Sequence, residues 1–93
     1  MSKYAVVISF NFDSTVSVLL FDTKDEAKKF IRKDLEEELW IDCVENGWDN
    51  LTTSWVSDDG HIAKLYNSFD DHENITEWRL ADVHEVPNWW GQL

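Results

Sequence analysis

The stretch TKDEAKKFIRKDLEEELWIDCVENG, residues 23–47, has the pattern of one long amphipathic helix. Thr23 and Glu26 have capping-box spacing, in which each side chain satisfies a free backbone donor of the first turn. Apolar residues recur at intervals of three and four, which gives the helix a stripe for packing on a sheet. The stripe consists of Ala27, Phe30, Ile31, Leu35 and Leu39. Asn46-Gly47 is a C-terminal stop signal, because glycine adopts the left-handed conformation cheaply. We therefore expect a helix over about residues 24–46.

The residues on either side of this helix have the patterns of β-strands. Residues 3–12 alternate polar and apolar, and residues 16–21 return after a short turn, so that the two segments predict a hairpin. Residues 52–56 and 61–67 flank Asp58-Asp59-Gly60, a second hairpin loop. A last strand is expected from residue 75 to about 85. The order ββαβββ predicts an α+β fold, an antiparallel sheet of about five strands with one helix packed on one face.

Length and composition indicate a single folded domain. The chain has 93 residues, and 43% of them are hydrophobic, enough for one modest core. We assign residues 1–86 to the domain and residues 87–93 to a C-terminal tail. No apolar run approaches the ~20 residues that span a bilayer, and the N-terminus is interpreted as a strand rather than a signal peptide. Cys43 is the only cysteine. We therefore expect a cytoplasmic protein that does not bind membranes.

The net charge is strongly negative and unevenly placed. The chain carries −11, and residues 34–93 hold fifteen acids against only two bases, Lys64 and Arg79. Such a balance disfavours direct binding of nucleic acid or of anionic membranes, and it favours a basic protein surface as the partner. The plainer interpretation is that the acidity only keeps a small protein soluble.

The acids of the helix lie at its unfavourable end. A helix C-terminus carries partial negative charge, yet residues 34–49 hold seven acids and no base. At 100° per residue, five of these acids fall along one line, and Glu36 and Glu37 widen the acidic zone. The line consists of Asp34, Glu38, Asp42, Glu45 and Asp49. This polarity indicates either a recognition surface or a helix that the rest of the fold stabilises.

A dense field of carboxylates can occupy a groove lined by Lys and Arg in place of DNA. In its size, its acidity and its lack of a catalytic motif, the chain resembles the DNA-mimic inhibitors of phages and mobile elements, such as anti-restriction and anti-CRISPR proteins. It carries no family motif. The resemblance implies a non-enzymatic inhibitor that blocks a nucleic-acid-binding protein. The expected partner-binding residues are Asp34, Glu37, Glu38, Asp42, Glu45, Asp49, Asp58, Asp59, Asp70, Asp71 and Glu73, with Trp48, Trp89 and Trp90 as apolar anchors.

Two other classes of function stay open. The first is a housekeeping interaction module, which could form a homodimer through an exposed sheet edge or through the tail. The second is a small metal-binding protein or enzyme. Asp70-Asp71-His72-Glu73 has ligand-type residues, and Cys43 could act as a nucleophile with His61 or His72 as its base. Contiguous loop residues rarely converge on one ion, and no Gly-rich phosphate loop is present. We therefore expect no catalytic residue, no metal and no cofactor.

Overall fold

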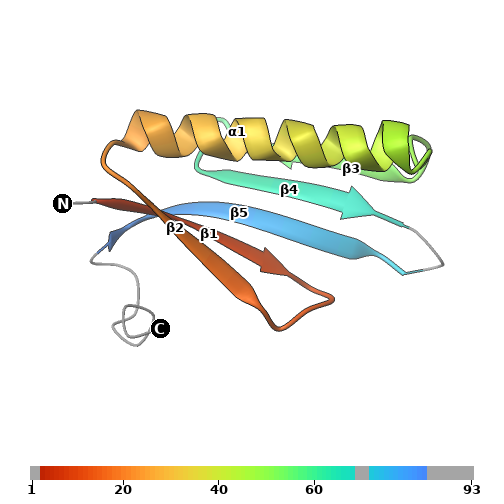
Figure 1. Cartoon of the computed structure of the whole chain (residues 1–93), viewed down its shortest axis with the longest axis horizontal. Helices are drawn as coiled ribbons and strands as arrows, with labels where there is room; N and C mark the ends of the chain where they lie inside the picture. Colours follow the sequence, from red (N-terminus) through yellow and green to blue (C-terminus); the bar gives the residue numbers. More distant parts are fainter. Residues whose placement is uncertain (1–2, 69–71, 84–93) are drawn as a thin grey trace.

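The computed structural model describes residues 3–68 and 72–83, and it confirms the α+β fold. The elements in chain order are β1 (Tyr4–Phe10), β2 (Val16–Phe21), α1 (Lys24–Trp40), the π-helical turn η1 (Ile41–Glu45), β3 (Thr52–Val56), β4 (Ile62–Asn67) and β5 (Asn74–Asp82). The five strands form one antiparallel sheet, and the single helix packs on one face of it (Figure 1). The expected tail, residues 87–93, lies outside the described residues.

The order of strands across the sheet is β2-β1-β5-β4-β3. The first and last strands are therefore neighbours in the middle, and β2 and β3 form the edges. The helix is the connection between these two edge strands, so the chain crosses one face of the sheet from edge to edge. Figure 1 shows α1 running along β4, while β1 and β2 diverge from it toward their shared turn.

The core lies between the helix and the middle three strands. Trp78 of β5 is fully buried, and its partners across the sheet are Ile8 of β1 and Ala63 of β4. Ile31 and Leu35 of the predicted apolar stripe belong to the same cluster. Burying an aromatic side chain of this size removes about 150–250 Å² from water, which corresponds to roughly 4–6 kcal/mol of transfer free energy. The apolar stripe of the helix and the alternating apolar residues of the strands thus form one core.

The other face of the sheet is not covered by the helix. Val16, Val18 and Leu20 of the edge strand β2 alternate onto this face and are exposed. Trp55 of β3 lies on the same face, with the ammonium of Lys64 6.0 Å from its ring centre. Trp55 is 49% exposed, so this strand tryptophan belongs to the open sheet surface and not to the core.

The helix begins as predicted and ends in a wider turn. The hydroxyl of Thr23 accepts a 3.2 Å hydrogen bond from the backbone N–H of Glu26. At the other end, the backbone N–H of Asn46 donates to the carbonyl of Ile41 at 2.9 Å, a bond across five residues. Gly47 follows with φ of +70°, the left-handed conformation expected of a stop. The predicted extent is therefore confirmed, but residues 41–45 are π-helical.

Candidate partner-binding site

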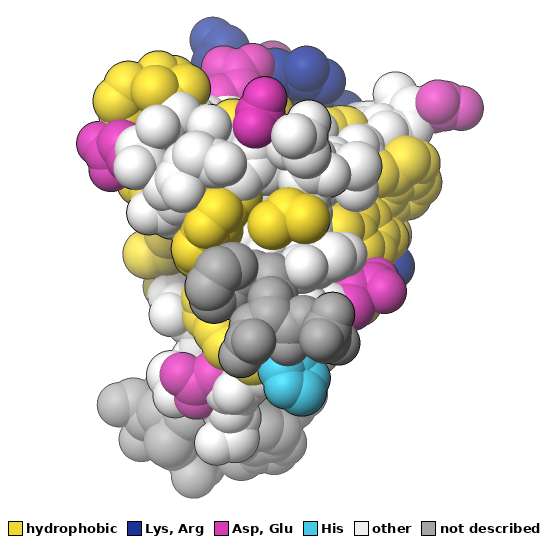
Figure 2. Space-filling model, turned by 90° about the vertical axis from the view of Figure 1, so that its right-hand side faces the viewer, with side chains coloured by type: hydrophobic (Ala, Val, Ile, Leu, Met, Phe, Trp, Pro, Cys, Tyr) yellow, Lys and Arg dark blue, Asp and Glu magenta, His cyan; other side chains and the backbone are white. Residues whose placement is uncertain are grey.

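The acids of residues 34–49 occupy the second half of the helix and the loop that follows it. Figure 2 views the end of the molecule where the helix ends and shows Asp and Glu side chains among hydrophobic and uncharged ones, with Lys and Arg side chains beside them at the top of the view. Of the line predicted at 100° per residue, Asp34, Glu38 and Asp42 lie close enough for the charges of Asp34 and Asp42 to raise the pKa of the Glu38 carboxyl. Glu45 does not share the pocket that Glu38 and Asp42 line. It is the last residue of the π turn, in which each residue rotates by a smaller angle than in an α-helix.

Asp34, the first residue of the predicted line, faces the sheet. Its carboxylate accepts a 2.8 Å hydrogen bond from the indole N–H of Trp78. Because Trp78 is fully buried, this bond satisfies a donor that water cannot reach. Asp34 therefore serves the core, although its charge lies close enough to Glu38 to raise the pKa of that carboxyl.

Glu38 and Asp42 line a pocket of about 280 Å³ between the end of the helix and the ends of three strands. Asp42 also accepts a 3.3 Å hydrogen bond from the side-chain amide of Asn67 in β4. The pocket lies where β1 diverges from the helix, and where the helix-facing side chains of the sheet change from apolar to polar. Its volume is below the roughly 300–1,000 Å³ of pockets that bury a small-molecule ligand, and it suits one side chain.

The walls of this pocket are aromatic on one side and polar on the other. Phe10 at the end of β1 and Phe12 just beyond it have ring centres 5.2 Å apart and planes tilted by 45°. Trp48, from the loop after the helix, also lines the pocket. Its backbone N–H donates to the carbonyl of Asp42 at 2.8 Å, a bond that folds this loop back onto the helix end. The remaining lining residues are Leu65, Asn67, Asn74 and Thr76.

The carboxylates at this pocket repel one another. Loss of surrounding water raises the pKa of the Glu38 carboxyl above its ordinary value of 4.5. The negative charges of Asp34 and Asp42, and then that of Glu37, raise this pKa further. Among the residues that the structure describes, the pocket lining contains no lysine or arginine to offset these charges. A cation entering the pocket would therefore relieve an existing repulsion.

A second acidic cluster lies on the outer side of the same helix end. Glu36, Glu37 and Glu45 line a shallow hollow of about 420 Å³ together with Trp40, which is 52% exposed. Within residues 3–68 and 72–83, Lys33 is the one base in its lining. Glu45 is thus on a different side of the helix from Asp42, and the acids form two clusters with an aromatic residue in each.

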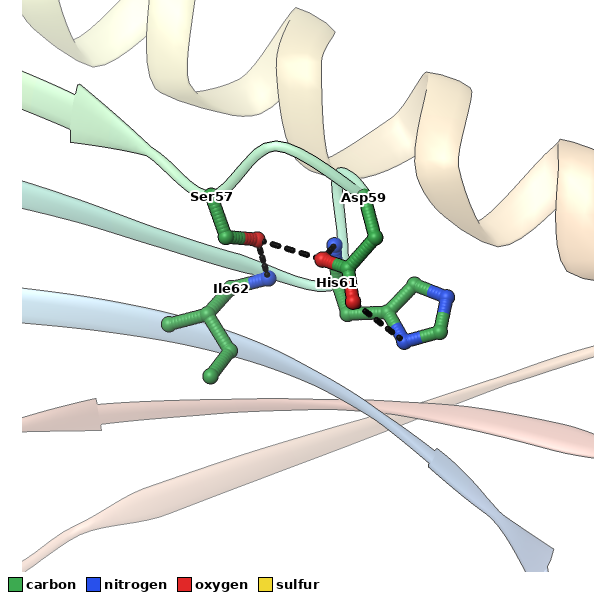
Figure 3. A network of polar contacts seen from close by, with 4 residues as sticks. All are labelled: Ser57, Asp59, His61 and Ile62. Carbon is green, nitrogen blue, oxygen red and sulfur yellow. Dashed lines mark hydrogen bonds and ion pairs between the residues drawn. The ribbon is translucent and has the colours of Figure 1, made fainter.

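Asp58 and Asp59 lie away from both clusters. They are in the β3–β4 turn and share a hollow with Lys28 and Arg32 from the basic half of the helix. Asp59 accepts hydrogen bonds from the Ser57 hydroxyl at 2.7 Å and from the His61 backbone N–H at 3.0 Å (Figure 3). These bonds lower the pKa of the Asp59 carboxyl. The structure places this turn beside basic residues and away from both acidic clusters, so the predicted acidic footprint does not reach it as one surface.

The structure describes some of the remaining predicted residues and not others. Asp49 and Glu73 are exposed, and the backbone carbonyl of Glu73 accepts a 2.8 Å bond from the side chain of Asn11. Asp70, Asp71, Trp89 and Trp90 lie outside the described residues. Phe12 and Asn74 of the pocket were not singled out from the sequence. Their signal in the sequence was weak. Phe12 continues the alternation of the first strand past its last paired residue, Phe10, and Asn74 is the first residue of the last strand.

Ion pairs do not neutralise the acids of the helix end. Within residues 3–68 and 72–83, the pairs closer than 4.0 Å join Asp59 to His61, Glu77 to Lys64, and Glu77 to Arg79. All of them lie on the sheet or in the β3–β4 turn. In the same part of the chain, His, Cys, Asp and Glu side chains do not gather in threes that could hold a metal ion. Nor does any described helix have the length and apolarity to cross a membrane.

Comparison of the chain with protein-family models, with curated proteins and with solved structures gave no match. The features that bear on function are therefore the pocket lined by Glu38 and Asp42 and the outer cluster of Glu36, Glu37 and Glu45.

Proposed function

We propose that this chain is a non-enzymatic cytoplasmic inhibitor that binds a basic, nucleic-acid-binding protein through the acidic end of its helix. The inhibitor would be of the anti-restriction or anti-CRISPR type made by phages and mobile elements. The observation that carries the proposal is the run of seven acids in residues 34–49, which has no base and forms no ion pair within the described residues.

The charge distribution supports this direction of binding. Five bases occupy residues 24–33 in the first part of the helix, so the helix has a basic half and an acidic half. A positive groove would attract the acidic end and orient the chain during approach. Because the carboxylates form two clusters, the contact would be made by two separate acidic areas on either side of α1. This differs from the continuous strip of charge that DNA presents.

The test is capture from lysate of a candidate host, with the full chain immobilised and eluted by stepwise increases in salt. We expect a basic nucleic-acid-binding protein to be retained at low salt and released at high salt, because exposed charge pairs are screened. Purified chain should then displace nucleic acid from that protein. A captured protein that still binds its nucleic acid in the presence of saturating chain would refute the inhibitor function.

Charge-reversal variants assign the binding surface. Glu37→Lys with Glu45→Lys changes two exposed carboxylates of the outer cluster and should weaken capture at least tenfold. The matched control is Asp25→Lys with Asp58→Lys, which makes the same change in net charge at the other end of the molecule. Equal loss in both variants would mean that only net charge matters, and the acidic end would not be the binding site.

One observation favours the alternative of a dimerisation module. The open face of the sheet exposes Val16, Val18 and Leu20 along an edge strand. Sedimentation of the wild-type chain over a range of concentrations tests this. If the chain dimerises and Val18→Lys with Leu20→Lys restores the monomer, the sheet face is an interface between copies.

A further inference from the structure

The pocket between the helix end and the sheet combines two carboxylates with three aromatic residues. From this combination we infer that it accepts the guanidinium group of a single arginine side chain of the partner. The inference rests on the proposed function, because it names the chemistry by which one residue of the basic partner would be held.

The negative charges of the pocket favour a cation as its ligand. Glu38 and Asp42 both line it, and none of its lining residues in the described part of the chain is basic. Asp42 accepts a 3.3 Å hydrogen bond from Asn67, but the ion pairs within the described residues do not include Glu38 or Asp42. A single positive charge between Glu38 and Asp42 would add two attractive contacts, which offset the one repulsive contact between the two carboxylates.

The aromatic walls are a separate feature that also suits a cation. Phe10 and Phe12 present tilted rings whose centres are 5.2 Å apart, and Trp48 comes from the loop after the helix. The face of an aromatic ring attracts a cation, most strongly when the cation has lost part of its water. Phe12 is 60% exposed although it is a large apolar residue, so its ring is accessible to a partner.

The shape and polarity favour arginine over lysine. A guanidinium is planar, stacks on aromatic rings and is more weakly hydrated than an ammonium, so it enters a partly apolar pocket at lower cost. It also has five donors, and Asn74 and Thr76 of the lining carry side-chain oxygens in addition to the two carboxylates. An ammonium has three donors and no plane for stacking. A volume of about 280 Å³ accommodates the end of one such side chain.

The test is a titration of the full isotope-labelled chain with N-acetyl-arginine amide, followed by nuclear magnetic resonance. The expected result is saturable shifts of the side-chain amide signals of Asn67 and Asn74 and of the Trp48 indole signal. N-acetyl-citrulline amide has nearly the same shape without the charge, and N-acetyl-lysine amide has the charge without the plane. Both should bind at least tenfold more weakly. Equal binding of citrulline or lysine, or shifts confined to other residues, would overturn the assignment.

Variants separate this inference from the proposed function. Glu38→Gln and Phe12→Leu should each weaken arginine binding at least fivefold, while Glu36→Gln on the outer side of the helix should leave it unchanged. If the pocket variants do not change the titration, the pocket assignment fails whether or not a target is captured. If the arginine analogue binds as expected but no basic protein is retained from lysate, the pocket stands and the inhibitor function fails.

Discussion

The indole N–H of Trp78 donates a 2.8 Å hydrogen bond to the carboxylate of Asp34. Trp78 is the largest fully buried side chain of the core, and Asp34 is the first acid of the acidic half of the helix. The bond fixes the helix to β5 at the point where its surface changes from basic to acidic. It also means that one of the seven acids has a structural role, which separates it from those available to a partner.

Removing this acceptor should destabilise the fold. Asp34→Ala leaves a buried indole donor without a partner, and such a loss costs about 1–3 kcal/mol of unfolding free energy. Asp34→Asn keeps an oxygen at the same position and should cost less. Urea unfolding of both variants measures the difference. In a Trp78→Phe background the Asp34→Ala change should cost less than in the wild type, and an undiminished cost would show that the bond contributes nothing.

Glu38→Gln should raise stability at neutral pH. The raised pKa means that the folded state disfavours the ionised Glu38 carboxylate. This cost is present above the folded pKa and disappears as the pH falls below the ordinary value of 4.5, where the carboxyl is protonated in both states. The advantage of the variant should therefore shrink on acidification. Thermal unfolding between neutral and acidic pH tests this, with Glu36→Gln as the control for loss of one negative charge from the same helix.

Asp59 should show the opposite dependence on pH. Hydrogen bonds from the Ser57 hydroxyl and the His61 backbone lower the pKa of the Asp59 carboxyl in the folded state. A lowered pKa contributes stability above the unfolded value of 3.8, and this is lost as the pH falls through the folded pKa. The stability deficit of Asp59→Ala should thus be largest near neutral pH and narrow below 3.8. Asp58→Ala, which removes the adjacent carboxylate but none of these bonds, should lack that dependence.

Gly47 should tolerate asparagine better than alanine. Its φ of +70° is unfavourable for residues with a Cβ, whereas a Cβ built there meets no atom within 4 Å. The cost of Gly47→Ala is therefore a backbone cost of about 1–2 kcal/mol. Asparagine adopts this conformation more readily, so Gly47→Asn should recover part of the loss in urea unfolding. Equal stability of the alanine variant and the wild type would contradict the left-handed assignment.

The elements of this fold follow from local patterns in the sequence. The stripe from Ala27 to Leu39 predicts the helix, the pair Asn46-Gly47 predicts its end, and the Asp-Gly pair at residues 59–60 predicts the second hairpin. Each of these signals depends on residues close together in the chain. The structure confirms all three, and the last strand ends at Asp82, a few residues before the expected position near 85.

The arrangement of the acids depends on contacts between distant residues, which explains why the sequence predicted it less well. Asp34 meets Trp78 across 44 positions, and β5 lies between β1 and β4 because the first and last strands pair. The turn at residues 57–61 consequently lies beside Lys28 and Arg32. Helical spacing alone could predict an acidic line, but it could not show which of these acids would form hydrogen bonds with residues of the sheet.

The π turn at residues 41–45 sets the rotational phase between the helix and everything that follows it. It holds one residue more per closed ring than an α-helical turn. Deleting one residue there would restore regular winding, shift the following chain by about 1.5 Å along the axis and swing it by about 100°. Trp48 would then leave its position in the lining of the pocket. The length of residues 41–45, more than their composition, therefore determines whether Trp48 lines the pocket.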